Sequence, residues 1–292
     1  MSMKQEGDLA GFKETVRREW SDPETVAAWR KWYPFFARQS ANATTAIIEA
    51  AQVRLGMDIL DLASGTGEPA LTLAQVVGPA GHVTATDLSP DMLEIAEEIA
   101  RQQRITNLTC QLADAEDLPF ADARFDAVTC RLGVMFFPDC ARALRESYRV
   151  LKPGGHAAFL AWGPFDQPFF MSTAGIIMQY QSLPMPAPGT PGRFRFAQKG
   201  TLAAHLLEAG FQQVRETTLT IPWPSGSVEE AWESSRDMRA PFRHLLSHLP
   251  QDERERLLAA VYTAIRQYEI GGEVIFPVVV VLAVGRRRAA SP

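Results

Sequence analysis

The sequence predicts an α/β protein with a doubly wound, seven-stranded and mostly parallel sheet that carries helical lid and cap insertions. Short apolar runs alternate with amphipathic helical stretches from residue 57 onward, as strands and helices do in such folds. The first apolar run ends in a glycine turn, "DLASGTGEPA". The chain has 292 residues, of which 46% are hydrophobic and 22% charged, so it is long enough for one large domain with a cap.

Local signals place the individual elements. Strands are expected at residues 57–63, 82–87, 107–113, 125–130, 156–162, 211–220 and 274–284. Helices are expected at residues 69–77, 89–103, 139–151 and 197–210, and "KPGG" after the third of these is typical of a helix stop. Ser89 is the expected N-cap of the second helix, with Pro90 at its first position. A long stretch of helical character separates the last two strands, which allows them to be antiparallel neighbours at one sheet edge.

These elements divide the chain into a core and three insertions. The core comprises residues 55–162, continues at 198–220 and ends in the last strand and a basic tail at 274–292. The insertions are an N-terminal helical lid at 1–54, a lid insertion at 163–197 and a helical substrate cap at 221–273. In the second insertion, "FDQPFFMSTAGIIMQYQSLPMPAPGTPGRFRF" combines Met, Phe and a Pro/Gly-rich loop, which is typical of a mobile gate.

The N-terminal lid contains a helix start at "SDPETVAAWRKWYPFF". Ser21 and Glu24 have the spacing of a capping box. Trp29, Tyr33 and Phe36 are spaced to share one helix face. Pro34 is expected to end or kink the helix, which would fold that face over the sheet edge.

Charge and cysteine content exclude several classes of protein. The formal net charge of -5 argues against nucleic acid or an anionic membrane as the main partner, and the only basic cluster, Arg286–Arg288, is expected as a solvated tail. Cys110, Cys130 and Cys140 form no CxxC pair, which favours reduced thiols. The start of the chain lacks an apolar signal region, and "VIFPVVVVLAVG" is too short to span a bilayer. We therefore expect a cytoplasmic protein without membrane insertion; its oligomeric state is left open.

The glycine turn by itself fits more than one function. Gly65, Gly67 and Ala70, followed by Asp87, match the pattern of dinucleotide-binding folds. An NAD(P)-dependent oxidoreductase is therefore one alternative, although neither a Tyr-x-x-x-Lys pair nor a His–carboxylate pair lies at the end of an expected strand. A non-catalytic protein that retained a cofactor-binding fold is another.

Four features around the turn resemble the class I S-adenosylmethionine-dependent methyltransferases. Asp61 precedes Gly65 by four residues, Asp87 ends the second strand, "ADAEDLPF" places Asp114 after the third, and "RVLKPGG" precedes the fifth. The closest likeness is to the small-molecule branch that includes the ubiquinone/menaquinone biosynthesis C-methyltransferases, and it is specific over residues 57–162. The resemblance implies a Rossmann-like methyltransferase fold and S-adenosyl-L-methionine as cofactor.

The same resemblance implies roles for individual residues. Asp87 would bind both ribose hydroxyls, Leu88 would lie against the adenine, and Asp114 with the Ala115 amide would bind the adenine edge. Arg131 would start the loop that runs under the methionine moiety. Independently, the cofactor's ammonium and ribose hydroxyls require acceptors such as Asp61, Asp87 and Asp114 at the carboxyl ends of the strands. Gly65 and Gly67 would let the backbone approach it closely.

The methyl acceptor is expected to be a small, largely apolar or aromatic metabolite. Aromatic residues are concentrated outside the core, and we expect Tyr33, Trp162, Phe165, Phe169 and Phe170 to bind the acceptor. The helix around Arg243 and His244 would form the opposite wall, with His244 as the candidate general base. Carbon and oxygen acceptors are favoured and nitrogen stays open. No metal site is predicted, because His244 and His248 have no further ligands beside them.

Overall fold

The computed structural model describes residues 3–180 and 189–290. Its sheet contains eight strands: β1 (Asp58–Leu62), β2 (His82–Asp87), β3 (Leu108–Leu112), β4 (Phe125–Arg131), β5 (Leu151–Trp162), β6 (Gln212–Pro224), β7 (Glu269–Ile270) and β8 (Glu273–Arg286). The strand order is β3-β2-β1-β4-β5-β8-β6, and β7 forms a short hairpin with β8. The predicted doubly wound sheet is confirmed.

Strand direction divides the sheet into two parts. β1 to β5 pair in parallel, whereas β8 is antiparallel to both β5 and β6. The chain order reverses at β1, between β2 and β4, which is the switch point where open α/β sheets bind ligands. The last two strands are therefore antiparallel neighbours at one edge, as the long helical stretch between them allows.

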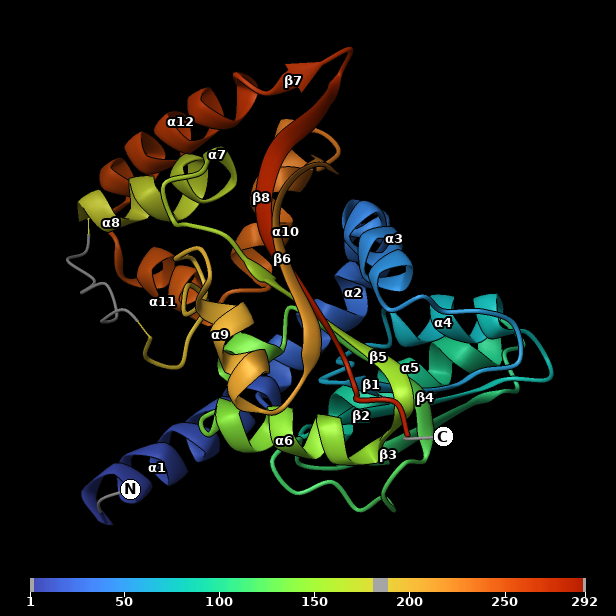
Figure 1. Cartoon of the computed structure of the whole chain (residues 1–292). Helices are drawn as coiled ribbons and strands as arrows, with labels where there is room; N and C mark the ends of the chain where they lie inside the picture. Colours follow the sequence, from blue (N-terminus) through green and yellow to red (C-terminus); the bar gives the residue numbers. More distant parts are fainter. Residues whose placement is uncertain (1–2, 181–188, 291–292) are drawn as a thin grey trace.

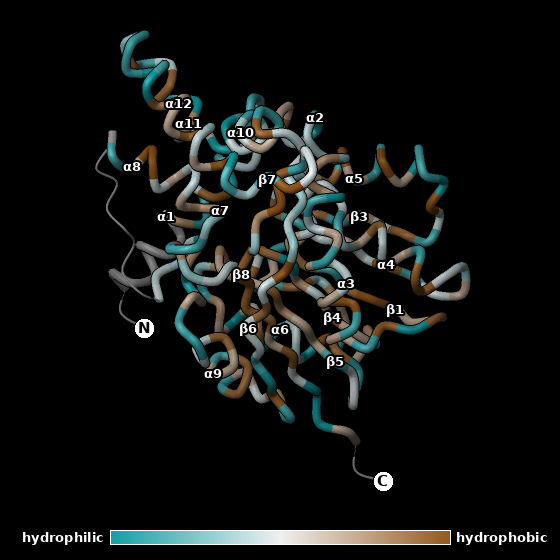
Figure 2. The backbone as a smooth tube through the Cα atoms, turned by 90° about the horizontal axis from the view of Figure 1, so that it is seen from above, coloured by the Kyte–Doolittle hydropathy of each residue, from teal (hydrophilic) through white to brown (hydrophobic). Residues whose placement is uncertain are grey.

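The sheet strands are apolar because both of their faces are covered. Ile59, Leu60 and Leu62 of β1 are fully buried, and so are Val278 and Val280 of β8. In Figure 2, hydrophobic stretches run through β1, β4, β5 and β8 at the centre of the molecule. Helices α3 (Ala41–Ala50), α4 (Ala70–Val77) and α5 (Pro90–Gln102) cover one face of the sheet, and α6 (Cys140–Val150) and α9 (Thr201–Glu208) cover the other (Figure 1).

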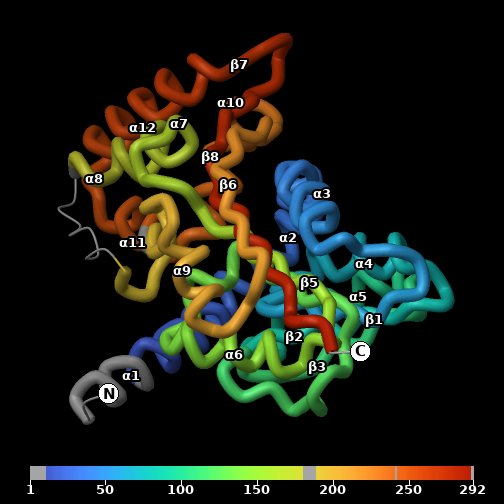
Figure 3. The backbone as a smooth tube through the Cα atoms, viewed as in Figure 1, coloured from blue at the N-terminus to red at the C-terminus, as the bar shows by residue number. Residues whose placement is uncertain are grey.

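The remaining helices lie outside this core. They are α1 (Met3–Trp20), α2 (Pro23–Gln39), α7 (Pro168–Phe170), α8 (Ile176–Tyr180), α10 (Val228–Asp237), α11 (Ala240–His248) and α12 (Gln251–Arg266), with a 3₁₀ turn η1 (Val134–Phe136) and a π-helical turn η2 (Met171–Gly175). Figure 3 shows α7, α8, α10, α11 and α12 together on the side of the sheet away from the C-terminus. Eight of the residues in the expected gate, 181–188, lie outside the described part of the chain.

The start of α2 differs from the expected capping box. Its N-cap is Asp22, whose carboxylate accepts a hydrogen bond from the Thr25 amide (2.9 Å). Pro34 does not end the helix, which continues to Gln39. Burial of Trp32, Tyr33 and Phe35 on either side of the proline favours continuation, and it offsets a proline cost of about 3 kcal/mol.

Two further differences lie near the C-terminal end of α6. Residues 152–155, expected as a turn, and Leu151, expected to end the helix, form the first part of β5, with an irregularity where Phe125 and Ala127 pair with Leu151 and His156. Arg286 and Arg287 are not a free tail, because Arg286 donates to the Gly154 carbonyl (2.9 Å) and Arg287 to the Arg149 carbonyl (2.6 Å). Among residues 3–180 and 189–290, no helix combines the length and the apolar character needed to cross a membrane.

Candidate active site

A cavity lies at the carboxyl edge of the parallel strands, over the switch point. We call it the edge cavity. Its lining comes from the loops after β1, β2, β3 and β4 and from helices α1 and α2, and includes Lys13, Arg17, Trp20, Trp29, Phe36, Ala63, Ser64, Gly65, Glu68, Asp87, Leu88, Asp114, Ala115, Glu116, Arg131, Leu132, Gly133 and Phe136. Six residues that the sequence assigns to cofactor binding line it: Gly65, Asp87, Leu88, Asp114, Ala115 and Arg131.

Asp87 is held rigidly at the end of β2. Its Oδ2 accepts a hydrogen bond from the Gly65 amide (2.8 Å), and its Oδ1 accepts one from the Ser89 amide (2.9 Å). Burial raises the pKa of this carboxyl, although the backbone amides of Ser89, Gly65 and Leu88 oppose the shift. Each carboxylate oxygen accepts up to two hydrogen bonds, so both retain capacity toward the cavity.

The two glycines of the turn have different roles. Both have a positive φ, which favours glycine. A Cβ on Gly65 would meet no atom within 4 Å, since the residue borders the open cavity. A Cβ on Gly67 would lie 2.6 Å from Leu71 and 3.1 Å from Ala96. Gly67 therefore permits close packing of α4 and α5, and it does not line the edge cavity.

The loop after β3 presents two carboxylates to the edge cavity. Asp114 accepts a hydrogen bond from Lys13 of α1 (2.8 Å), and Glu116 also pairs with Lys13. Glu116 accepts a second bond from the Asp139 amide (2.8 Å). These contacts join α1 to the sheet edge.

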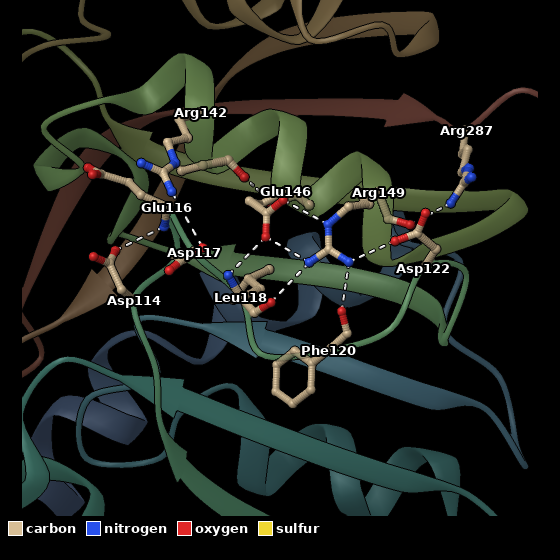
Figure 4. Close-up of polar contacts among 12 residues, drawn as sticks. Asp114, Glu116, Asp117, Leu118, Phe120, Asp122, Arg142, Glu146, Arg149 and Arg287 are labelled. Atoms are coloured by element: carbon tan, nitrogen blue, oxygen red, sulfur yellow. Dashed lines mark hydrogen bonds and ion pairs between the residues drawn. The ribbon is translucent and has the colours of Figure 1, made fainter.

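Side chains of α6 fix the same loop (Figure 4). Arg149 donates to the carbonyls of Leu118 (2.9 Å) and Phe120 (2.7 Å). Glu146 accepts from the Leu118 amide (2.9 Å) and pairs with Arg149 (2.7 Å). The backbone that carries Asp114 and Glu116 is therefore held by a charged side-chain pair as well as by β3.

Arg131 and Glu68 form a buried polar pair at the other end of the edge cavity. Arg131, the last residue of β4, donates to the Glu68 carbonyl (2.9 Å) and to the hydroxyls of Ser40 and Thr44. Its Nε has no partner among the described residues. The Glu68 carboxylate accepts from the Thr72 hydroxyl (2.8 Å), and burial raises its pKa. Burial lowers the pKa of Arg131, an effect that the charge of Glu68 opposes.

Asp61 does not line the edge cavity, contrary to the expectation from sequence. Its side chain is fully buried beside β4, where Oδ1 accepts a hydrogen bond from the Thr129 hydroxyl (2.6 Å). Oδ2 has no hydrogen-bond partner among the residues that the structure describes. Burial raises the pKa of Asp61 to about 7. The side chain thus contacts the neighbouring strand, whereas the Asp61 backbone carbonyl contacts the glycine turn by accepting from the Ser64 hydroxyl (3.0 Å).

A second cavity, which we call the aromatic cavity, adjoins the edge cavity. Its volume is about 340 Å³. Trp20, Trp29, Phe36, Leu132 and Phe136 line both cavities and form the wall between them. Trp162, Phe165, Phe169, Phe170, Phe194, Phe242, Glu19, Arg193 and Arg239 are among its other lining residues.

Rings from distant segments pack around the aromatic cavity. Trp162, at the end of β5, stacks on Phe169 with centroids 5.7 Å apart and an interplanar angle of 20°. Phe170 meets Trp162 edge to face at 5.3 Å and Phe194 at 4.9 Å. The expected acceptor-binding residues Trp162, Phe165, Phe169 and Phe170 are therefore brought together.

Two other expected site residues lie elsewhere. His244 is exposed, lies 4.3 Å from the His248 ring and lines neither cavity; α11 contributes Phe242 to the aromatic cavity. Its neighbour Arg243 pairs with Asp22 and Glu24 of α2 (3.3 Å each). Tyr33 packs with Leu71 and Met92 behind the glycine turn.

Sequence reasoning did not assign site roles to Lys13, Glu68, Glu116, Arg193 and Arg239. Glu68 directly follows the glycine turn and Glu116 lies two residues after Asp114, so proximity to the motifs would have found these two. Lys13, Arg193 and Arg239 lie in segments without a motif. Among residues 3–180 and 189–290, no group of three or more His, Cys, Asp or Glu side chains is arranged to hold a metal ion.

Comparison with known proteins gives a consistent result. Residues 38–190 match the model of the ubiE/COQ5 methyltransferase family. The chain is 34% identical over 187 residues to the ubiquinone/menaquinone biosynthesis C-methyltransferase UbiE of Photorhabdus laumondii, covering 59% of this chain and 73% of the relative. It is 33% identical over 177 residues to a demethylmenaquinone methyltransferase of Listeria monocytogenes, covering 56% and 73%.

Solved structures support the fold. Phosphoethanolamine N-methyltransferase 2 of Haemonchus contortus, in complex with S-adenosyl-L-methionine, matches with a TM-score of 0.54 at 19% identity, over 85% of this chain and 52% of that one. The strand order, the cavity at the switch point and the family match agree with one another. The chain therefore belongs to the ubiE/COQ5 methyltransferase family, whose S-adenosylmethionine-dependent methyl transfer the sequence motifs predict.

Proposed function

We propose that the protein transfers a methyl group from S-adenosylmethionine to a carbon or oxygen atom of a small aromatic or apolar metabolite bound in the aromatic cavity. The observation that carries this proposal is the shared wall of Trp20, Trp29, Phe36, Leu132 and Phe136 between the two cavities. A methyl group held in the edge cavity against this wall would lie next to a space lined by rings. The names of the relatives refer to quinone biosynthesis, which favours a ring carbon as acceptor atom.

The edge cavity fits the nucleoside part of the cofactor. Asp87 has the free acceptor capacity for both ribose hydroxyls, because its two amide contacts leave further lone pairs. Leu88 offers an apolar surface to the adenine, and the Ala115 amide with the Asp114 carboxylate lies beyond it. Lys13 closes this end by pairing with Asp114 and Glu116.

The opposite end of the edge cavity fits the amino acid part. Arg131 has a buried Nε without a partner, and a carboxylate is the group that it binds best. The Glu68 carboxylate lies beside it and suits a positively charged group. The pair thus matches a ligand that carries both a carboxylate and a cation.

The cofactor supplies an activated methyl group, so the chain contributes mainly alignment and exclusion of water. The aromatic wall of Trp20, Trp29 and Phe36 shields the junction of the two cavities from solvent. Holding two reactants in line is worth about 7–11 kcal/mol of barrier in favourable cases. The aromatic cavity has no histidine among its described lining residues, and Glu19 is the carboxylate there. Where the reaction requires removal of a proton from the substrate, Glu19 or water accepts that proton.

The segments outside the core would act as lid and cap. Segment 1–54 contributes Trp20 and Trp29, segment 163–197 contributes Phe169, and segment 221–273 contributes Phe242 to the cavity walls. We assign α1 as the part that opens, because the Lys13–Asp114 ion pair that joins it to the sheet edge is partly exposed.

A labelled-methyl assay tests the proposed function. Purified protein is incubated with deuterated-methyl S-adenosylmethionine and a panel of reduced naphthoquinols and phenols, and products are identified by mass spectrometry. We expect transfer of an intact labelled methyl group to a ring carbon or oxygen and inhibition by S-adenosylhomocysteine. Cofactor binding without transfer to any member of the panel would favour a non-catalytic protein. Tight binding of NADH with no binding of S-adenosylhomocysteine would favour an oxidoreductase.

A further inference from the structure

The aromatic cavity contains two arginines that the proposed methyl transfer does not use. Arg193 and Arg239 line it, and neither lines the edge cavity. The other charged residue of the lining is Glu19. Two cations and one anion leave the described lining with a net positive charge inside a space otherwise formed by rings, apolar chains and small polar groups.

Arg239 is held by rings and hydroxyls. Its guanidinium lies 5.1 Å from the centroid of Phe242 and 5.5 Å from that of Phe169. It donates hydrogen bonds to Ser235 Oγ (2.8 Å) and Thr173 Oγ1 (3.3 Å). Among the residues that the structure describes, no carboxylate lies within ion-pair distance of it. Burial lowers the pKa of Arg239 well below its usual range, and the nearby charge of Arg193 adds to this effect.

Arg193 is placed by the chain on either side of it. The Gly192 amide donates to the Met135 carbonyl (2.9 Å), and Arg195 donates to the Phe137 carbonyl. The next residue, Phe194, packs edge to face on Phe165 (5.3 Å). In the described part of the chain, Arg193 has no hydrogen bond and no ion pair. Burial lowers its pKa, and the charge of Glu19 partly opposes this shift.

Two guanidinium groups in an apolar cavity carry a desolvation cost that an anion would offset. Arg193 and Arg239 are half-buried, and a charge withdrawn from water without a partner is unfavourable. A guanidinium paired with a carboxylate forms a charge-assisted, often bidentate bond. The rings of Phe169 and Phe242 pack on the Arg239 guanidinium. Among the described residues only its Nη1 donates hydrogen bonds, so its other donors are available to a ligand. An apolar acceptor alone would leave both charges unpaired.

We propose that the methyl acceptor carries an oxyanion, with a carboxylate as the best fit, that binds between Arg193 and Arg239 while its apolar or aromatic body lies against Trp162, Phe165 and Phe169. This inference rests on the proposed function, and it names the substrate class for the same site. The excess of one positive charge in the lining matches a monoanion. Because neither arginine lines the edge cavity, the anionic end lies away from the transferred methyl group, and the opposite end of the acceptor faces it.

The test compares an anionic probe with a neutral probe of the same shape. Binding of 1-naphthoate and of 1-naphthamide is measured by calorimetry in the presence of saturating S-adenosylhomocysteine. The parent protein is expected to bind 1-naphthoate at least tenfold more tightly. Arg193→Gln and Arg239→Gln are each expected to lower naphthoate affinity at least tenfold and to leave naphthamide affinity within a factor of two. Arg254→Gln, an exposed arginine on α12, is the matched control and should bind as the parent does.

Binding of S-adenosylhomocysteine is measured separately for every variant. We expect it to be unchanged, which also shows that the variants are folded. Equal affinity for the two probes in the parent, or no detectable binding of 1-naphthoate, would overturn the inference alone while cofactor binding persists. If the parent protein does not bind S-adenosylhomocysteine, the proposed function and this inference are overturned together.

Discussion

Replacement of Asp87 is the most direct test of how the edge cavity binds the cofactor. The carboxylate accepts hydrogen bonds from the Gly65 and Ser89 amides and would accept two more from the ribose. A hydrogen bond to a charged group contributes about 1.5–3 kcal/mol. In the variant, water forms some of the hydrogen bonds that the carboxylate made to the ribose. We therefore expect Asp87→Ala to cost about 2–4 kcal/mol of cofactor affinity.

This free energy corresponds to a dissociation constant raised about 30- to 900-fold. Titration calorimetry with S-adenosylhomocysteine measures it, and Asp87→Asn, which retains one acceptor oxygen, should fall between the parent and the alanine variant. Asp87→Ala also leaves both the Gly65 and the Ser89 amide without their partner, and Asp87→Asn leaves one of them, at about 1–3 kcal/mol of stability for each amide. Thermal unfolding without ligand must therefore be recorded for each variant.

Glu94→Gln is the matched control, because this carboxylate lies on the exposed side of α5 and outside the edge cavity. It should bind S-adenosylhomocysteine as the parent does. Parent-like affinity in a folded Asp87→Ala variant would refute the assignment of the ribose to this side chain. The position of the nucleoside that we inferred from the resemblance to methyltransferases would then be wrong.

Three further predictions follow from other parts of the site. The pKa of Asp61 is raised from 3.8 to about 7 in the folded state, so the folded protein retains a proton that the unfolded chain loses. The free energy of unfolding should therefore fall as pH rises from about 4 to 7, by up to about 4 kcal/mol from this group. Denaturant unfolding across this range checks it, and an Asp61→Asn variant with the same slope as the parent would contradict it. Lys13→Ala should speed hydrogen exchange in residues 11–20, because it removes the contacts of α1 with Asp114 and Glu116. Stability should change by less than about 1 kcal/mol, since the Lys13 side chain is 28% exposed. Unchanged exchange, with Arg18→Ala as control, would show that these contacts do not hold α1. His244→Ala should leave kcat for methyl transfer within about twofold, since the side chain is exposed and lines neither cavity; a tenfold loss would restore it as a candidate base.

The core was predictable because its signals are local. An apolar run between turn residues indicates a strand, and the N-cap of α5 at Ser89 follows from the residue type and the proline after it. The general rule that ligands bind at the carboxyl ends of parallel strands then placed Asp87 and Asp114 at one edge. Each of these inferences requires only a few neighbouring residues.

The direction of a side chain within an element was harder to predict. Asp61 lies at a strand end as expected, but its carboxylate faces Thr129 of the neighbouring strand. His244 lies on a helix that does reach the aromatic cavity, but Phe242 is on the inward face. A difference of two residues on a helix rotates a side chain by about 200°, so the helix alone does not identify the residue that faces the ligand.

The partners in the aromatic cavity come from segments whose separation in sequence hides their proximity. In the sequence, Arg193 precedes β6 and Arg239 follows it, and neither residue belongs to a periodic pattern. The two arginines line one cavity because the insertions after β5 and β6 fold back over the same sheet edge. No local sequence rule predicts this folding back.

The arrangement separates the two tasks of the enzyme between different parts of the chain. The residues proposed to face the cofactor follow the strands of the core, where strand pairing fixes the position of the backbone. The residues proposed to face the acceptor come mainly from insertions, which can change without disturbing the sheet. The shared wall of Trp20, Trp29 and Phe36 is the point at which both tasks meet. Substitutions there should affect kcat, because they alter alignment at the transferred methyl group, whereas substitutions at Arg193 or Arg239 should mainly raise the KM for the acceptor.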